Sequence, residues 1–531
     1  MRVLEKNKFL LLPLTVGIML VVYSWFLSYP LSIDYLGDFV FNHISVLYWF
    51  GLVLTLASMY MIAVTSRRSS LKWTMTIGIV MTMYSLSYFY YMLPGSDSQS
   101  TRGLTEFFIR TRNLDPSQPG HSYFQWPSFF ISANTITSVS GLGLATIEFL
   151  FYAIIGFLLV TTLYVYASKV SKNGGFLAVI VFFVVMFNFL NYQFVPFSFA
   201  FGLLLLLFML ESRRRSSGMT IAMLVLFVGI TLMHVFVPIF FILYLLIQSI
   251  LTRDKQHGRL FLLTLIIYLL VEFALASTGF ASSILSVMTS RTEYSQIAII
   301  KTPVPVPIDA IAQMLAGIVE IAFGIACLAG FILLLVKRKI RSLDKAIFLT
   351  GLIYSGVGVM LFTLGSRAIP IAFIPISLGV LYLFESRFRL YVASFFLVLL
   401  VLFVFIPLHA SFIDSQITFQ TKEAYQTENF MIDHYNWTNP SLILAHVRVM
   451  TYLQAKQPST AYFEDDVYSP LFPRIKQYDA IVYTVGLGIN LLRFNYTTER
   501  ILGEAELNMV HNDGFSYIAI KSSNFTYAPT R

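Results

Sequence analysis

Residues 218 to 251 read GMTIAMLVLFVGITLMHVFVPIFFILYLLIQSIL and contain no Lys, Arg, Asp or Glu. One helix needs about 20 apolar residues to cross the roughly 30 Å hydrocarbon core of a membrane, so this run is too long for a single span. Because Pro238 cannot donate a backbone hydrogen bond, we divide the run near His234 and Pro238. The stretch predicts two successive transmembrane helices.

The composition extends this prediction to most of the chain. Of the 531 residues, 57% are hydrophobic and only 12% are charged, which excludes a water-soluble globule and a disordered chain. Cys327 is the only cysteine, so neither an intramolecular disulfide nor a Cys-x-x-Cys site can form. The predicted fold class is an α-helical polytopic membrane protein.

Helices satisfy every backbone polar group inside a bilayer without closing into a barrel. A further break is placed at Pro196 by the argument used for Pro238. Thirteen spans are then predicted, at 9–28, 45–65, 74–92, 143–167, 176–195, 196–211, 218–234, 235–251, 260–278, 310–336, 346–366, 368–384 and 390–408.

The charged residues predict the orientation of these spans. If the N-terminus is cytoplasmic, every cytoplasmic junction is basic, as the positive-inside rule requires. The net charge of +9 therefore reflects loop orientation, and no nucleic-acid partner is expected. The protein is predicted to lie in the cell membrane with its C-terminus extracytoplasmic. Its longer outer loops are 29–44, 93–142 and 279–309.

The residues after the last span differ in composition from the rest. Residues 410 to 531 carry 9 Lys and Arg against 12 Asp and Glu, together with sequons at Asn436, Asn495 and Asn524. We predict a membrane domain over 1–408 and an extracytoplasmic α/β domain over 409–531. Its predicted strands are 442–445, 479–484 and 517–520, and its predicted helices are 420–435 and 489–503.

The first outer loop places Asp34 and Asp38 four residues apart among bulky apolar residues. If this stretch is helical, both carboxylates lie on one face. Such a pair can act as a general base on a hydroxyl, or hold a divalent cation such as Mg²⁺ or Mn²⁺. The alternative is an ordinary solvated loop.

The second outer loop contains the string HSYFQWPSFF from His121 to Phe130. Its candidate binding residues are His121, Tyr123 and Trp126, because sugar rings and lipid headgroups both favour aromatic faces with polar edges. An interfacial aromatic belt is the alternative.

His234 and Arg367 are predicted at the outer ends of spans, where either can meet an anionic headgroup or a lipid-linked phosphate. For Arg367 the alternative is contact with ordinary phospholipid. Glu148, Glu272 and Glu320 fall within predicted spans, where an ionisable group usually faces a partner or a cavity. Glu293 lies in the third long outer loop, where it covers a substrate or is a plain loop acid.

With these features the chain resembles the C-type membrane glycosyltransferases, a superfamily that includes oligosaccharyltransferases, protein O-mannosyltransferases and aminoarabinose transferases. The residues that carry the resemblance are the first-loop acids, the aromatic string 121–130 and the string VHNDGFSYI at 510–518. The two strings are similar to those of uncharacterised archaeal members. The resemblance implies a polyprenyl-phosphate sugar donor, with Asp38 or Asp34 as the catalytic acid. It also places Glu293 at a later acidic loop position and Arg367 near the carrier phosphate.

The chain also departs from this superfamily. The oligosaccharyltransferase string Trp-Trp-Asp-Tyr-Gly is absent, and so are the P-loop, Rossmann, Gly-x-Ser-x-Gly and His-Glu-x-x-His motifs. We predict a transferase that moves a sugar to a glycan, lipid or protein acceptor on the outer face. A transporter or lipid flippase, a polysaccharide polymerase or ligase, and a non-catalytic scaffold are the alternatives.

Overall fold

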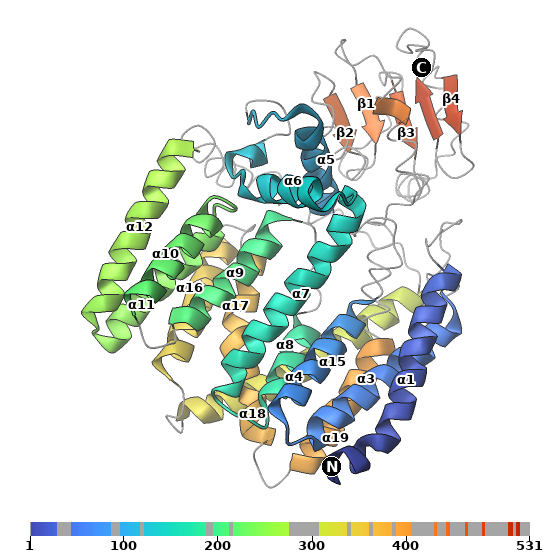
Figure 1. Ribbon diagram of the computed structural model, residues 1–531, viewed down its shortest axis with the longest axis vertical. Coiled ribbons are helices and arrows are strands. Elements are labelled where there is room, and N and C mark those ends of the chain that lie inside the picture. The colour runs from blue at the N-terminus through green and yellow to red at the C-terminus, as the bar shows by residue number, and fades with distance from the viewer. Residues whose placement is uncertain are drawn as a thin grey trace.

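The computed structural model of the protein is a helical bundle with a small sheet at one end (Figure 1). It describes residues 2–28, 44–85, 96–116, 122–186, 195–211, 216–275, 307–336, 341–360, 365–384, 389–405, 430–432, 442–445, 462–465, 480–483, 508–512 and 517–520. Its helices are α1 (Arg2–Ser28), α3 (Val46–Thr65), α4 (Ser69–Met83), α5 (Ser96–Thr111), the 3-10 helix η2 (Ser122–Gln125), α6 (Ser128–Ser140), α7 (Leu144–Ser168), α8 (Gly175–Val185), α9 (Pro196–Glu211), α10 (Ser217–Thr231), α11 (Val237–Thr252), α12 (Lys255–Leu275), α15 (Pro307–Val336), α16 (Ser342–Met360), α17 (Gly365–Ser377), α18 (Gly379–Phe384) and α19 (Arg389–Phe405).

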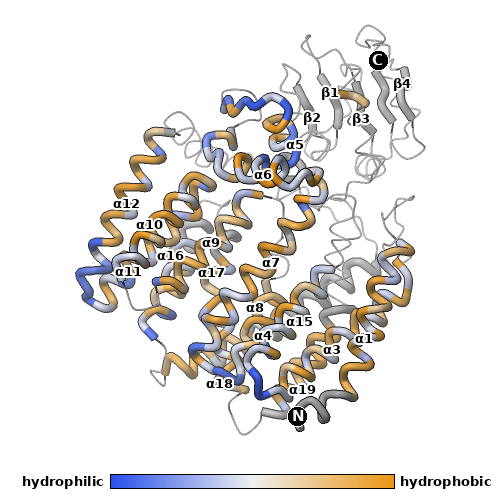
Figure 2. The backbone as a smooth tube through the Cα atoms, in the orientation of Figure 1, coloured by the Kyte–Doolittle hydropathy of each residue, from blue (hydrophilic) through white to orange (hydrophobic). Residues whose placement is uncertain are grey.

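Helices occupy all thirteen predicted span positions, and they are apolar along most of their length (Figure 2). By length and composition, four helical stretches of the described chain can cross a membrane. These are Phe9–Ser28, Val46–Thr65, Leu144–Ser168 and Lys255–Ala274. The other apolar helices are shorter in their described parts, so the number of crossings stays a prediction.

The predicted break in the run 218–251 is confirmed. α10 ends at Thr231 and α11 begins at Val237, with Pro238 in the first turn of α11 where its missing N–H costs nothing. The predicted span over 368–384 is occupied by α17 and α18, which are interrupted only at Leu378.

A close helix crossing lies next to this interruption. A Cβ on Gly379 would lie 2.0 Å from the carbonyl oxygen of Cys327, and one on Gly330 would lie 2.1 Å from the carbonyl oxygen of Gly379. α15 and the start of α18 therefore touch backbone to backbone, a contact that only glycine permits.

The segment predicted as the second outer loop, residues 93–142, contains helices. It holds α5 and α6, and Figure 1 shows α6 lying across the ends of the long helices. α6 ends at Gly141, whose φ of 69° is the left-handed conformation that commonly closes a helix.

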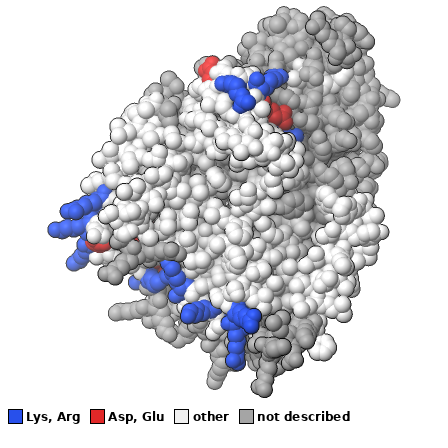
Figure 3. All heavy atoms as spheres, in the orientation of Figure 1, with Lys and Arg blue, Asp and Glu red and all other residues white. Residues whose placement is uncertain are grey.

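Basic side chains gather at the other end of the bundle, along the lower edge of Figure 3. We call this the basic end and define it by exposed Arg67, Arg68, Lys169, Lys172, Arg253, Lys255 and Arg259. The N-terminus lies at the basic end, whereas α5, α6 and the sheet lie at the opposite end (Figure 1).

The sheet has the strand order β2-β1-β3-β5-β4. β1 is parallel to β2 and β3, whereas β5 is antiparallel to β3 and β4. The strands are β1 (Leu442–Ala445), β2 (Tyr462–Asp465), β3 (Ala480–Tyr483), β4 (Asn508–Asn512) and β5 (Tyr517–Ile520). The three predicted strands are confirmed. The predicted helices fall outside the described residues apart from 430–432, so the α/β domain stays a prediction.

Candidate functional site

The structure describes only part of the predicted site. Asp34, Asp38, His121 and Glu293 lie outside the described residues. The side chain of Glu320 does as well. Arg367 falls in the first turn of α17, and only its backbone is described. Tyr123, Trp126 and His234 are described fully, and they lie at the end opposite the basic end.

Tyr123 and Trp126 differ in their surroundings. Tyr123 is exposed, whereas Trp126 is only 7% exposed and packs with Val235 and Phe236 of the α10–α11 connection. The backbone N–H of Ser128 also donates a hydrogen bond to the carbonyl oxygen of Leu232 in the same connection, at 3.2 Å. The segment from η2 to α6 is therefore fixed to the α10–α11 connection, and burial separates Trp126 from the lipid-facing belt that was its alternative reading.

Trp126 has a polar partner that the sequence did not reveal. Its indole Nε1 donates a hydrogen bond to Oε1 of Glu272, at 3.2 Å. Glu272 lies near the end of α12 and is 2% exposed. Glu272 was expected to face a partner or a cavity, and Trp126 is that partner.

His234 is buried at the start of the same connection. Its Nδ1 accepts a hydrogen bond from the backbone N–H of Phe236, at 3.1 Å. Its ring lies against the ring of Phe197, with 5.4 Å between the centroids. Because Nδ1 accepts this hydrogen bond, the neutral imidazole carries its proton on Nε2.

A second intramembrane glutamate, Glu148 near the start of α7, joins an ion-pair network. Nη1 of Arg102 lies 3.2 Å from Oε2 of Glu148, and Nε of Arg102 lies 3.0 Å from Oε1 of Glu106. Arg102 is 3% exposed and Glu148 is 1% exposed. Because Arg102 belongs to α5, this buried network ties the second outer loop to the bundle.

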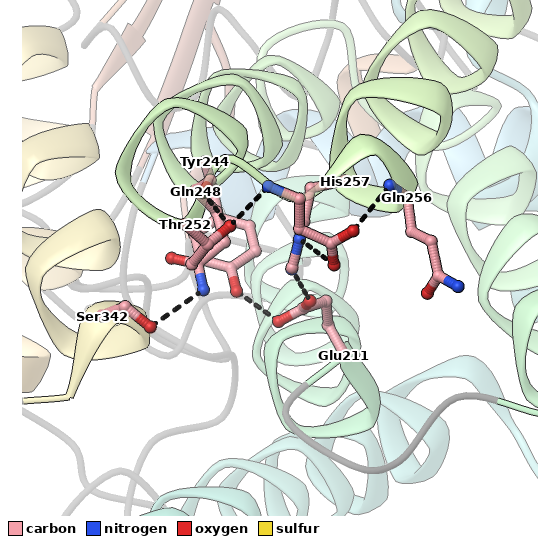
Figure 4. Close-up of polar contacts among 8 residues, drawn as sticks. Glu211, Tyr244, Gln248, Thr252, Gln256, His257 and Ser342 are labelled. Carbon is pink, nitrogen blue, oxygen red and sulfur yellow. Dashed lines mark hydrogen bonds and ion pairs between the residues drawn. The ribbon is translucent and has the colours of Figure 1, made fainter.

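A third polar cluster lies at the basic end and was not predicted (Figure 4). Glu211, the last residue of α9, accepts a hydrogen bond from the hydroxyl of Tyr244 on α11. Its Oε1 lies 2.7 Å from Nε2 of His257 on α12, and Nδ1 of His257 lies 2.9 Å from Oδ2 of Asp254. These contacts connect the basic ends of three helices.

No group of three His, Cys, Asp or Glu side chains that could hold a metal ion occurs within the described ranges. The residues predicted to hold Mg²⁺ or Mn²⁺ are Asp34 and Asp38, which lie outside those ranges. The divalent cation therefore stays a prediction.

No family model matches the chain, and no curated protein matches it. Among solved structures, the chain is similar to ArnT from Cupriavidus metallidurans in the apo state, with a TM-score of 0.50 and 10% sequence identity. The similarity covers 85% of this chain and 98% of ArnT. ArnT from the same organism bound to undecaprenyl phosphate gives a TM-score of 0.47 at 11% identity, over 84% of this chain and 97% of that chain.

At this level of identity the similarity concerns the fold. The chain shares the fold of ArnT over 85% of its length. The resemblance to archaeal members is a separate prediction that this comparison does not address.

Proposed function

We propose that the protein is a membrane glycosyltransferase that moves a sugar from a polyprenyl-phosphate donor to an acceptor on the extracytoplasmic face. The observation that carries the proposal is the fold, which matches that of ArnT over 85% of the chain. One fold can support many activities, so the activity depends on the residues at the end opposite the basic end.

The proposed orientation puts the basic end in the cytoplasm and the sheet outside. The exposed Arg and Lys side chains of the basic end support this orientation through the positive-inside rule. The three sequons of the tail agree with it. We accordingly propose a membrane domain over 1–408 and an extracytoplasmic domain over 409–531.

The distribution of buried charge favours a transferase over a transporter. The buried side chains of Lys72, Arg102, Glu148, Glu211 and Glu272 lie in the first or last turns of their helices or in α5. A transport path needs polar groups near the middle of the bilayer, and none of these five side chains lies there. Glu320 lies near the middle of α15, and its side chain is outside the described residues.

In the proposed reaction, the acceptor hydroxyl attacks the anomeric carbon of the sugar while the bond from that carbon to the phosphate oxygen breaks. Asp38 or Asp34 takes the proton of the hydroxyl, and the polyprenyl phosphate leaves with the electron pair. Arg367, with His234, stabilises the growing negative charge of the phosphate. The position of Arg367 in the first turn of α17 supports this role, because unpaired backbone N–H groups at a helix start also attract anions.

The test is sugar transfer from a labelled polyprenyl-phosphate sugar by the full chain in proteoliposomes. We expect Asp34→Asn combined with Asp38→Asn to abolish turnover, whereas Asp115→Asn in the second outer loop serves as a matched control and leaves turnover within twofold. Unaltered turnover in the double variant would eliminate the assigned base. The absence of transfer by the wild-type protein, across donors that differ in their sugar, would eliminate the proposed function.

A further inference from the structure

Glu272, at the outer end of α12, is a buried carboxylate with only part of its hydrogen-bonding capacity used. Its Oε1 accepts the hydrogen bond from Trp126, but its Oε2 is buried and has no hydrogen-bond partner in the described part of the chain. The hydroxyl of Tyr268, one turn earlier, cannot serve it because that hydroxyl donates to the oxygen of Val235, at 3.2 Å. A carboxylate that can accept about four hydrogen bonds is thus left with one oxygen unused.

The segment that covers Glu272 carries a second unused acceptor. Oε1 of Gln125, the residue before Trp126, is also buried without a hydrogen-bond partner among the described residues. Trp126 packs with Val235 and Phe236. Gln125 and Trp126 are thus neighbours in the chain, and the indole of Trp126 contacts Glu272 on α12.

This arrangement is costly for folding. A buried acceptor without a partner lowers stability, and a charged one lowers it more. Glu272 also forms no ion pair within the described ranges, although buried charges are normally paired. Glu148 provides the contrast, because Arg102 neutralises it at the same end of the bundle. The missing interaction at Glu272 is one that a hydrogen-bond donor can supply.

We propose that Glu272, Gln125 and Trp126 form a subsite that binds the transferred sugar through its hydroxyl groups. The proposal rests on the proposed function and adds to it a described site for the sugar. A carboxylate and an amide oxygen accept hydrogen bonds from sugar hydroxyls, and an indole offers a flat apolar face to the ring. Because both acceptors are covered here, a sugar enters only when the segment from η2 to α6 separates from the α10–α11 connection, which breaks the hydrogen bond from Ser128 to Leu232.

The test compares the affinity of the full chain in nanodiscs for two lipid probes. One probe is a panel of polyprenyl-phosphate hexoses and pentoses, and the other is the same polyprenyl phosphate without a sugar. Glu272→Gln keeps an oxygen for Trp126 but replaces the unused acceptor with a donor. We expect Glu272→Gln to lower the affinity for the best sugar-bearing lipid by about 10- to 100-fold, because a charge-assisted hydrogen bond to the sugar is lost. The affinity for the sugar-free lipid should stay unchanged.

Thermal unfolding of the same variants separates binding from structure. We expect Glu272→Gln to melt at or above the wild-type temperature, because it removes a buried charge without breaking a described contact. Glu148→Gln, the matched control, should melt lower because it breaks an ion pair with Arg102.

Two results overturn the subsite while leaving the proposed function intact. One is that Glu272→Gln binds both lipids as the wild type does, and the other is that it weakens both lipids equally and melts lower. If the wild-type protein binds neither probe, the proposed function fails and the subsite fails with it.

Discussion

Replacing Arg102 with Met tests whether the second outer loop is tied to the bundle by a buried ion pair. Met keeps much of the apolar stem and removes the guanidinium, so Glu148 loses a cation while remaining 1% exposed. Removing one partner of a buried pair costs about 3–5 kcal/mol. We expect the lower end of this range, because the side chain of Glu106 is 17% exposed and regains contact with water.

The assay is the free energy of unfolding in mixed lipid and detergent micelles, followed by circular dichroism during titration with a denaturing detergent. Arg110→Met on the same helix is the control, because Arg110 is exposed and exposed substitutions usually stay within about 0.5 kcal/mol. Combining Arg102→Met with Glu148→Leu should restore most of the loss, since replacing both buried charges by apolar groups is often neutral. The reasoning is refuted if Arg102→Met is as stable as Arg110→Met, or if the double variant is no more stable than the single one.

Three further outcomes are expected. Gly379→Ala should lower the free energy of unfolding by at least about 1–3 kcal/mol, because its Cβ would clash with backbone. Gly229→Ala in α10 is the control and should be neutral or stabilising by about 0.5–1 kcal/mol, because nothing lies within 4 Å of the added Cβ. Equal effects of the two substitutions would contradict the close helix crossing. His257→Phe should cost about 1–3 kcal/mol in the same assay, because Glu211 loses a charge-assisted hydrogen bond; a melting temperature equal to that of the wild type would show that this contact adds no stability. Arg367→Met should lower kcat/KM for transfer by about 100- to 1000-fold, at least as much as loss of either first-loop aspartate; a smaller loss would remove Arg367 from the phosphate site.

The positions of the long helices could be predicted from the sequence because one physical requirement dominates there. Apolar residues must be continuous over the bilayer, and the backbone must satisfy itself within each segment. Pro238 then marked a helix boundary, since proline in the first turn of a helix costs no hydrogen bond. The close approach of Gly379 to the backbone of Cys327 could not be predicted in this way, because the two residues are distant in the sequence.

The candidate site was less predictable because its contacts join distant residues. The cost of an intramembrane carboxylate predicted that Glu148 and Glu272 need partners. The sequence carries no signal that these partners are Arg102 and Trp126. Glu211 was missed because it lies at the end of an apolar run next to Arg213, where a charged residue normally needs no explanation.

The most direct measurement is native mass spectrometry of the full chain purified in mild detergent, with bulk phospholipid and polyprenyl-phosphate sugar competing for it. The account predicts a stoichiometric complex with the polyprenyl-phosphate sugar that persists in excess phospholipid and is lost in Arg367→Met. A protein that carries only phospholipid, and exchanges it for no polyprenyl-phosphate lipid, would contradict the claim that this fold handles a lipid-linked sugar.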